Sequence, residues 1–194
     1  MKPVLAAVTA AGSGLLGASL ASRPGSRRFH VLTVSVAATW LAGARVAGPV
    51  RRGSADVVQP VAVGAGAFGV FYGCALVARR IPLLRRAIAG VLDHARRGPT
   101  ASVAATTLLT GAAEEVFFRG ALYDASGARV ATAVYVLSTT ATRNPALVLA
   151  SAVMGTLFAW QRGRSGGVQA PLLTHVVWSA LMLAFMPRLF PPEG

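Results

Sequence analysis

The amino-acid sequence predicts an all-α, polytopic transmembrane helix bundle with about seven spans and one amphipathic helix in the membrane interface. Hydrophobic residues make up 54% of the 194-residue chain and charged residues only 13%, whereas about 25% of the residues in a soluble domain are charged. Apolar blocks of about 20 residues, the length that crosses a bilayer as a helix, recur along the chain. None of these blocks shows the alternation of a membrane β-barrel, so helices are the structure that satisfies the backbone in lipid.

The positive charge of the chain has the distribution of a membrane protein rather than that of a nucleic-acid-binding protein. The formal net charge is +13, from 19 lysines and arginines against 6 acids. Many arginines lie as pairs or triplets between apolar blocks, as they do where they flank transmembrane helices. These are Arg23, Arg27, Arg28, Arg45, Arg51, Arg52, Arg79, Arg80, Arg85, Arg86, Arg96 and Arg97. We therefore expect the lipid bilayer, and no nucleic acid, as a partner.

The expected spans follow from the apolar blocks and from the turns rich in Arg, Pro and Gly that separate them. They are residues 3–22, 30–48, 57–78, 101–123, 128–142, 145–161 and 168–187, of which 128–142 is short. Residues 81–97 place apolar side chains near one face and arginines elsewhere, which predicts a helix in the interface plane. We divide this single membrane domain into N-terminal helices with the interfacial helix, residues 1–98, and core helices, residues 99–190.

Two adjacent glutamates lie inside the apolar segment LLTGAAEEVFFRGALY, residues 108–123. An ionisable group near the bilayer centre costs on the order of 2.5–3.5 kcal/mol, so these acids require a reason. Glu115 and Arg119 are four residues apart and can pair on a helix, whereas Glu114 lies about 100° round the axis and is poorly placed for that arginine. The spacing predicts one structural pair and one free carboxylate. A buried ion cluster that only fixes the helix register is the alternative.

A histidine lies inside another apolar span, in PLLTHVVWSALML, residues 171–183. Neutral imidazole can bind a metal, accept a proton or hydrogen-bond an oxyanion, although a lone histidine is also common as a satisfied core residue. Together, a glutamate and a histidine on separate helices can activate a water for hydrolysis. Since both are costly in lipid, we expect Glu114 and His175 to face the bundle interior.

The segment EEVFFRG, residues 114–120, resembles the EExxxR motif of the CPBP family, the CAAX-protease and bacteriocin-processing intramembrane proteases. Residues 155–179, GTLFAWQRGRSGGVQAPLLTHVVWS, are similar to that family's last conserved block, and the resemblance covers roughly residues 100–187. It implies a multi-pass protein of the bacterial cell membrane that acts on a peptide or membrane-protein substrate.

The resemblance also implies roles for single residues. Glu114 matches the family's water-activating base, and His175 matches the histidine of the last motif. Glu115 and Arg119 match the second glutamate and the arginine, which support the site.

Two positions depart from the family's pattern. The middle motif is FxxxH, and its best match, residues 135–139, ends in Thr139 instead of a histidine. The residue four after the last histidine is usually asparagine or a similar side chain, and here it is Ser179. Thr139, Ser179 and the nearby Asn144 are the candidate pocket residues, because a further polar side chain between Glu114 and His175 would keep hydrolysis credible.

The missing histidine weakens a metal site in particular. Threonine is a poor ligand and cannot act as a base near neutral pH. Glu114 and His175 supply two good ligands, whereas a catalytic zinc usually takes three from the protein. The cofactor stays open between a divalent metal such as zinc, held by these two residues if at all, and metal-free chemistry.

Two functional classes follow. The first is an intramembrane endopeptidase similar to the CAAX prenyl proteases, in which a glutamate-activated water attacks a peptide bond at or in the membrane. The second is a catalytically impaired relative that binds a membrane peptide or partner, for instance in immunity or as a scaffold. A polar pocket between Glu114 and His175 favours hydrolysis, and a dry, closed one favours binding.

Overall fold

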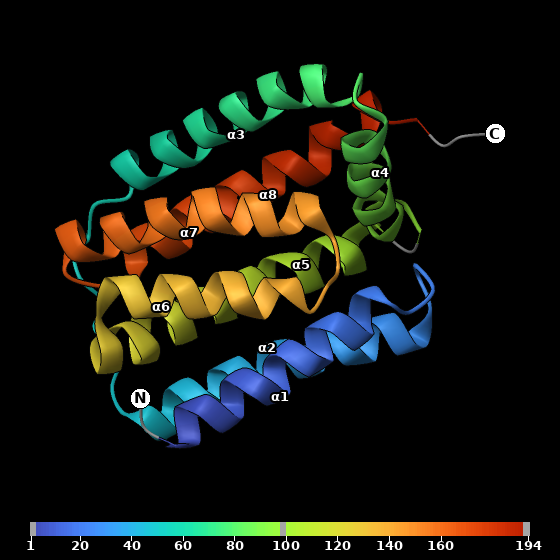
Figure 1. Ribbon diagram of the computed structural model, residues 1–194. Helices are drawn as coiled ribbons and strands as arrows, with labels where there is room; N and C mark the ends of the chain where they lie inside the picture. Colours follow the sequence, from blue (N-terminus) through green and yellow to red (C-terminus); the bar gives the residue numbers. More distant parts are fainter. Residues whose placement is uncertain (1–2, 98–99, 192–194) are drawn as a thin grey trace.

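Nine helical segments and no β-strand form the described part of the chain in the computed structural model, which describes residues 3–97 and 100–191 (Figure 1). In chain order they are α1 (Pro3–Leu20), α2 (Arg27–Ala47), α3 (Val58–Ala78), α4 (Pro82–Arg96), α5 (Thr100–Glu114), the π-helix η1 (Glu115–Leu122), α6 (Tyr123–Thr140), α7 (Pro145–Ser165) and α8 (Gln169–Leu189). The predicted all-α class is confirmed. The expected division between residues 98 and 99 lies outside the described residues.

Local sequence accounts for several helix ends. Ser26 caps α2, since its hydroxyl oxygen accepts a backbone N–H of the first turn at 3.1 Å. Asn144 caps α7 in the same way, with two backbone N–H groups of the first turn on Oδ1. Gly166 ends α7 in the left-handed conformation, with φ at 73°. Gly127, with φ at 80°, kinks α6 and separates the two helices expected at residues 101–123 and 128–142.

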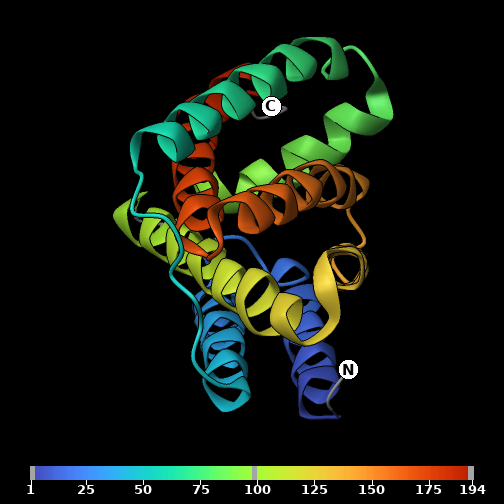
Figure 2. The same ribbon diagram turned by 90° about the vertical axis from the view of Figure 1, so that its left-hand side faces the viewer.

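The helices pack side by side as one bundle (Figures 1 and 2). The α1–α2 hairpin packs against α5, η1 and α6, while α3 packs along α8 on the other side of the molecule. Aromatic residues fill the seam between α2 and η1: the Trp40 and Phe117 ring centroids lie 4.9 Å apart, and Phe118 contacts both rings. This apolar core fixes the position of η1, which carries Glu115 and Arg119.

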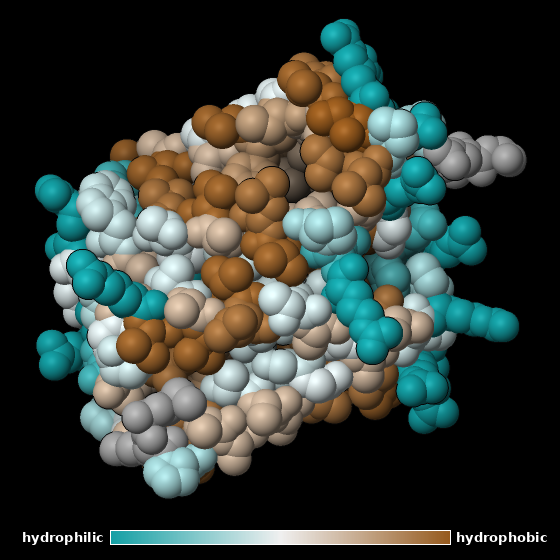
Figure 3. Space-filling view, viewed as in Figure 1, coloured by the Kyte–Doolittle hydropathy of each residue, from teal (hydrophilic) through white to brown (hydrophobic). Residues whose placement is uncertain are grey.

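Four helices, α1, α2, α3 and α8, are long and apolar enough to cross a membrane. A helix of 21 residues is about 32 Å long, close to the thickness of a bilayer's hydrocarbon core. The other three expected spans, formed by α5 with η1, by α6 and by α7, run beside these helices (Figure 1), and only the first four meet the criterion of length and composition. Hydrophilic side chains gather mainly at the two ends of the molecule, and apolar ones cover the face between them (Figure 3). The protein is an integral membrane protein.

The helix α4 lies where the sequence predicts an interfacial segment. It has 15 residues, runs across one end of the bundle, and packs against α5, α7 and α8 (Figure 1). Its Leu92 is buried with Ala75, Met186 and Phe190, whereas Leu83 is exposed. An amphipathic helix across the end of a bundle is typical of a helix that lies in the membrane interface.

Candidate active site

The two glutamates lie at the junction between α5 and η1, inside the bundle. Glu115 is fully buried, and Glu114 is half-buried on the wall of a cavity. The backbone from Glu115 to Leu122 is π-helical, a rare winding that is frequent at functional sites. The apolar run around the glutamates predicts a helix here but not this winding.

The predicted pair between Glu115 and Arg119 is present and fully buried. Arg119 Nη1 donates to Glu115 Oε1 at 3.3 Å, and Nη2 donates to the carbonyl oxygen of Gly155 at 3.3 Å. The guanidinium lies 4.1 Å from the ring centroid of Tyr135 and 5.1 Å from that of Phe158. These rings and hydrogen bonds compensate for removing the arginine from water.

Glu115 also binds the imidazole of His175. The Nδ1 atom lies 2.9 Å from Glu115 Oε1, and because a carboxylate only accepts, Nδ1 carries the proton. The ring stacks on Phe158 with centroids 4.8 Å apart, and its Nε2 edge faces Gly111, where an added Cβ would lie 3.1 Å from Nε2. This contact joins residues 60 positions apart, and sequence reasoning did not predict it.

Glu114 has a different partner. The hydroxyl of Tyr135 donates to Glu114 Oε2 at 3.2 Å. Sequence reasoning missed this tyrosine as a site residue. The available signal was the tyrosine itself, which stands where the FxxxH motif has phenylalanine and so adds a hydroxyl to the bundle interior.

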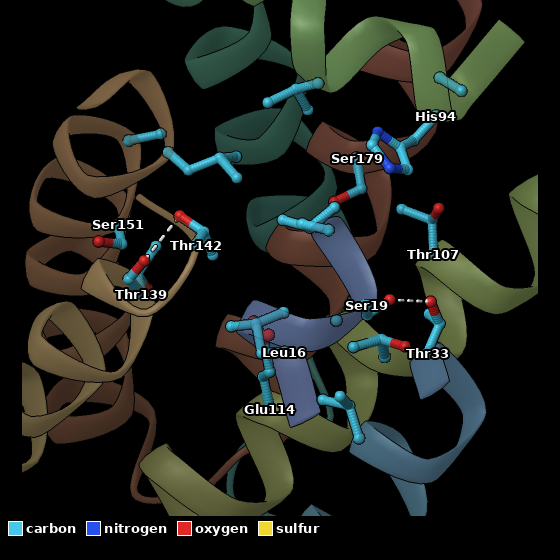
Figure 4. Close-up of a pocket in the computed structure, with 18 of the residues that line it drawn as sticks. Leu16, Ser19, Thr33, His94, Thr107, Glu114, Thr139, Thr142, Ser151 and Ser179 are labelled. Atoms are coloured by element: carbon cyan, nitrogen blue, oxygen red, sulfur yellow. Dashed lines mark hydrogen bonds between the residues drawn. The ribbon is translucent and has the colours of Figure 1, made fainter. Parts of the chain in front are cut away.

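Glu114 and His175 both line a cavity of about 260 Å³. Both residues face the interior, as expected from their cost in lipid. The cavity extends from Glu114 towards His94 of α4 (Figure 4). Its lining is largely apolar, and the remaining polar side chains on it are Ser19, Thr33, Thr107, Thr110, Tyr135, Thr139, Thr142, Ser151 and Ser179.

The candidate pocket residues have different positions. Thr139 lines the cavity, and its hydroxyl donates to the carbonyl oxygen of Tyr135 at 3.0 Å. Ser179 lines the cavity one turn after His175, and within the described residues no hydrogen bond engages its hydroxyl. Asn144 lies outside the cavity lining, because its carboxamide caps α7 and donates to the carbonyl oxygen of Ala87 at 2.8 Å.

The donor set does not fit a zinc held by three protein ligands. Within residues 3–97 and 100–191, no group of three or more His, Cys, Asp and Glu side chains is close enough to hold a metal ion. Glu114 and the Nε2 atom of His175 would supply two ligands, and Glu115 Oε1 already accepts from Arg119 and His175.

Two further side chains, those of Arg162 and Gln161, hold the helices around the site in register. Arg162 Nε donates to the carbonyl oxygen of Arg119 at 2.7 Å, and its Nη2 pairs with Asp124 at 2.7 Å. Gln161 Nε2 donates to Thr174 Oγ1 at 2.8 Å, beside His175. Since Arg162 and Gln161 belong to α7, this helix ties η1 to α8.

Comparison with known proteins gives one family. Residues 96–181 match the family model described as "Rce1-like: Type II CAAX prenyl endopeptidase Rce1-like", a range that contains Glu114, Glu115, Arg119 and His175. Neither the curated proteins nor the solved structures give a match. The family model confirms the resemblance to the CPBP proteases: residues 96–181 of this chain are similar to the Rce1-like family.

Proposed function

We propose that this protein is a multi-pass intramembrane endopeptidase of the bacterial cell membrane, in which a water activated by Glu114 attacks a peptide bond of a membrane peptide or protein. One observation carries the proposal: Glu114 and the Nε2 edge of His175 face the same cavity inside an apolar bundle. The family match supports a CAAX-protease-type endopeptidase in general. We further propose that residues 99–190 form the catalytic core and residues 1–98 its membrane support.

The proposed first step is attack by water. Glu114 accepts one proton as the water oxygen bonds to the carbonyl carbon. The Nε2 lone pair of His175 accepts a hydrogen bond from the second hydrogen, which stays on the water oxygen, because Glu115 keeps the imidazole proton on Nδ1. Glu115 and Arg119 thus act as positioning residues.

The negative charge of this step develops on the carbonyl oxygen. Ser179 is the proposed donor to this oxyanion, because its hydroxyl lies on the cavity one turn beyond His175. The proton held by Glu114 then passes to the leaving nitrogen as the C–N bond breaks, which regenerates the carboxylate. The OH of the water ends in the new carboxyl group, and its other hydrogen ends on the new amine.

The second functional class, a catalytically impaired relative that binds a peptide, rests on threonine at position 139. The cavity is open to both site residues and contains polar groups, since Glu114, His175 and Ser179 all line it. This lining favours hydrolysis over a dry binding pocket.

The proposal is tested by identifying the product. Purified protein in lipid nanodiscs is incubated in ¹⁸O-water with matched peptides, with and without a farnesyl group, and the fragments are analysed by mass spectrometry. We expect a new C-terminal carboxylate that carries one ¹⁸O, and the same rate with a metal chelator. A peptide that binds to the protein but stays intact would establish the impaired relative instead.

A further inference from the structure

Six arginines line a second hollow, at the end of the bundle where α4 lies. This hollow, which we call the arginine pocket, has a volume of about 720 Å³. Its lining consists of Arg79, Arg80, Arg85, Arg86, Ala89, Gly90, Asp93, Arg96, Arg97, Leu189, Phe190 and Pro191. Asp93 is the one acid among these described lining residues, so the six arginines give the lining a formal charge of +5.

The helix α4 forms a wall between the arginine pocket and the active-site cavity. Arg86, Gly90, Asp93 and Arg97 follow one face of the helix at intervals of three or four residues and line the arginine pocket. Val91, His94 and Ala95 lie on another face and line the cavity that contains Glu114. The two hollows therefore share one short helix.

In the described part of the chain, the contacts of Arg79, Arg80 and Arg86 leave most of the donors of these three arginines available. Arg96 pairs with Asp93 at 3.5 Å and donates to the carbonyl oxygen of Pro187 at 2.7 Å. Arg86 Nε donates to the carbonyl oxygen of Pro82 at 3.3 Å, and the two Nη atoms make no hydrogen bond with the described residues. Arg79 and Arg80 are exposed. A set of convergent guanidinium groups of this kind matches the oxygens of a phosphate, which arginine binds with paired N–H donors.

The position of the arginine pocket identifies the source of the phosphate. It lies at the end of α3, a candidate membrane span, beside an amphipathic helix that crosses the end of the bundle. Hydrophilic side chains project from this end of the molecule, next to the apolar face that lipid covers (Figure 3). Ile81 and Leu83 at the start of α4 are exposed apolar side chains beside the arginines, a combination typical of a helix in the membrane interface.

We propose that the arginine pocket binds the headgroup of an anionic phospholipid, with the phosphate held by Arg79, Arg80 and Arg86. Basic residues near a membrane surface contribute about 1 kcal/mol each to binding of anionic lipid, which corresponds to about fivefold in affinity per arginine. The bound headgroup fixes the α3–α4 corner, and through α4 it fixes one wall of the active-site cavity. The lipid site itself does not depend on the proposed catalytic function.

Native mass spectrometry of the full chain tests the site. The protein is released from micelles that contain equimolar phosphatidylglycerol and phosphatidylcholine, and the lipids that stay bound are counted. We expect wild type to retain phosphatidylglycerol at least about tenfold better than phosphatidylcholine. The triple variant Arg79→Gln, Arg80→Gln and Arg86→Gln should lose about 100-fold in phosphatidylglycerol affinity. These arginines are exposed. If the triple variant fails to fold, the three single variants replace it, and each should lose about fivefold in phosphatidylglycerol affinity.

The matched control removes the same charge from the same end of the bundle. Arg23, Arg27 and Arg28 are exposed near the α1–α2 turn, whose Ser22 carbonyl oxygen contacts His94 of α4 at 3.1 Å. Replacing these three arginines with glutamine should leave phosphatidylglycerol binding within about twofold of wild type. Equal losses in the two triple variants would show diffuse surface charge and overturn the proposal. Displacement of phosphatidylglycerol by excess inorganic phosphate would assign the pocket to a soluble anion and overturn the lipid as its ligand.

Discussion

Glu114 and Glu115 are neighbours in the sequence, but they have different partners in the structure. Glu115 is fully buried and accepts hydrogen bonds from Arg119 and His175, whereas Glu114 lines the cavity and accepts one from Tyr135. A buried carboxylate that accepts hydrogen bonds from an arginine and a histidine supports the site, and one that faces the cavity can exchange a proton with water. This difference predicts different responses to substitution.

Arg119→Ala should be much more destabilising than Glu114→Gln. Removing Arg119 leaves the buried Glu115 carboxylate with the His175 hydrogen bond but without its arginine, at a cost of about 3–5 kcal/mol. Glu114→Gln, in contrast, keeps a polar group against Tyr135. The free energy of unfolding, measured in bicelles, checks this. Arg129→Ala removes an exposed arginine and is the control, with an expected change within about 0.5 kcal/mol. Similar losses of stability in Arg119→Ala and Glu114→Gln would contradict the different roles.

Ser179→Ala should lower kcat by about 10²–10³ without a comparable change in KM, because the proposed hydrogen bond to the oxyanion forms only in the transition state. Steady-state cleavage of a fluorogenic peptide in nanodiscs measures both constants. Ser151→Ala, which removes another hydroxyl that lines the cavity, is the control. A change in KM alone would assign Ser179 to substrate binding.

Thr139→His restores the family's middle motif and distinguishes an active enzyme from an impaired one. If Glu114 and His175 already hold the water, the substitution should change kcat/KM by less than about tenfold, with some loss through crowding. A gain of about 10²–10³ that disappears when Glu114→Gln is added would identify the wild type as an impaired protease. Cleavage that does not depend on Glu114 in either background would contradict both versions.

At the scale of elements, the site depends on how closely α5 approaches α8. Gly111 of α5 faces the imidazole of His175, and an added Cβ would lie 3.1 Å from Nε2. Glycine is a poor helix former, so its presence in α5 costs about 1 kcal/mol relative to alanine. The space that it leaves keeps the Nε2 edge accessible.

Gly111→Ala should therefore raise helix stability slightly and lower cleavage, since the methyl group displaces either His175 or the water beside it. We expect kcat/KM to fall by about tenfold or more while the unfolding temperature stays the same or rises. Gly66→Ala is the control, because nothing lies within 4 Å of a Cβ at that position of α3. Equal effects of the two alanines on cleavage would exclude a specific role for the gap at Gly111.

The elements that sequence predicts best are those set by composition. The apolar blocks predict α1, α2, α3 and α8, and the arginine-bearing amphipathic pattern predicts α4. The Glu115–Arg119 pair is also predictable, because helical spacing alone brings the residues together. Sequence does not predict that Glu115 contacts His175 or that Glu114 contacts Tyr135, because these contacts depend on how separate helices are rotated about their axes. The π-helical winding of η1 has no periodicity signal in so short a segment.

At the scale of the whole molecule, an apolar bundle surrounds a small polar site. The cavity is lined by residues of α1, α2 and every helix from α4 to α8 except η1. Few waters enter such a space, so each charge and hydrogen bond inside it is stronger than it would be in water. The same enclosure requires a water to be held for attack, which is the role that we assign to Glu114 and His175.

The central claim is that Glu114 activates the water, and the most direct test compares cleavage with binding in Glu114→Gln. Wild type and variant are placed in identical nanodiscs, and the single-turnover cleavage rate and the dissociation constant are measured for one peptide substrate. We predict that the cleavage rate falls by at least about 10²-fold while the dissociation constant changes by less than about threefold. A variant that cleaves at the wild-type rate would contradict the account.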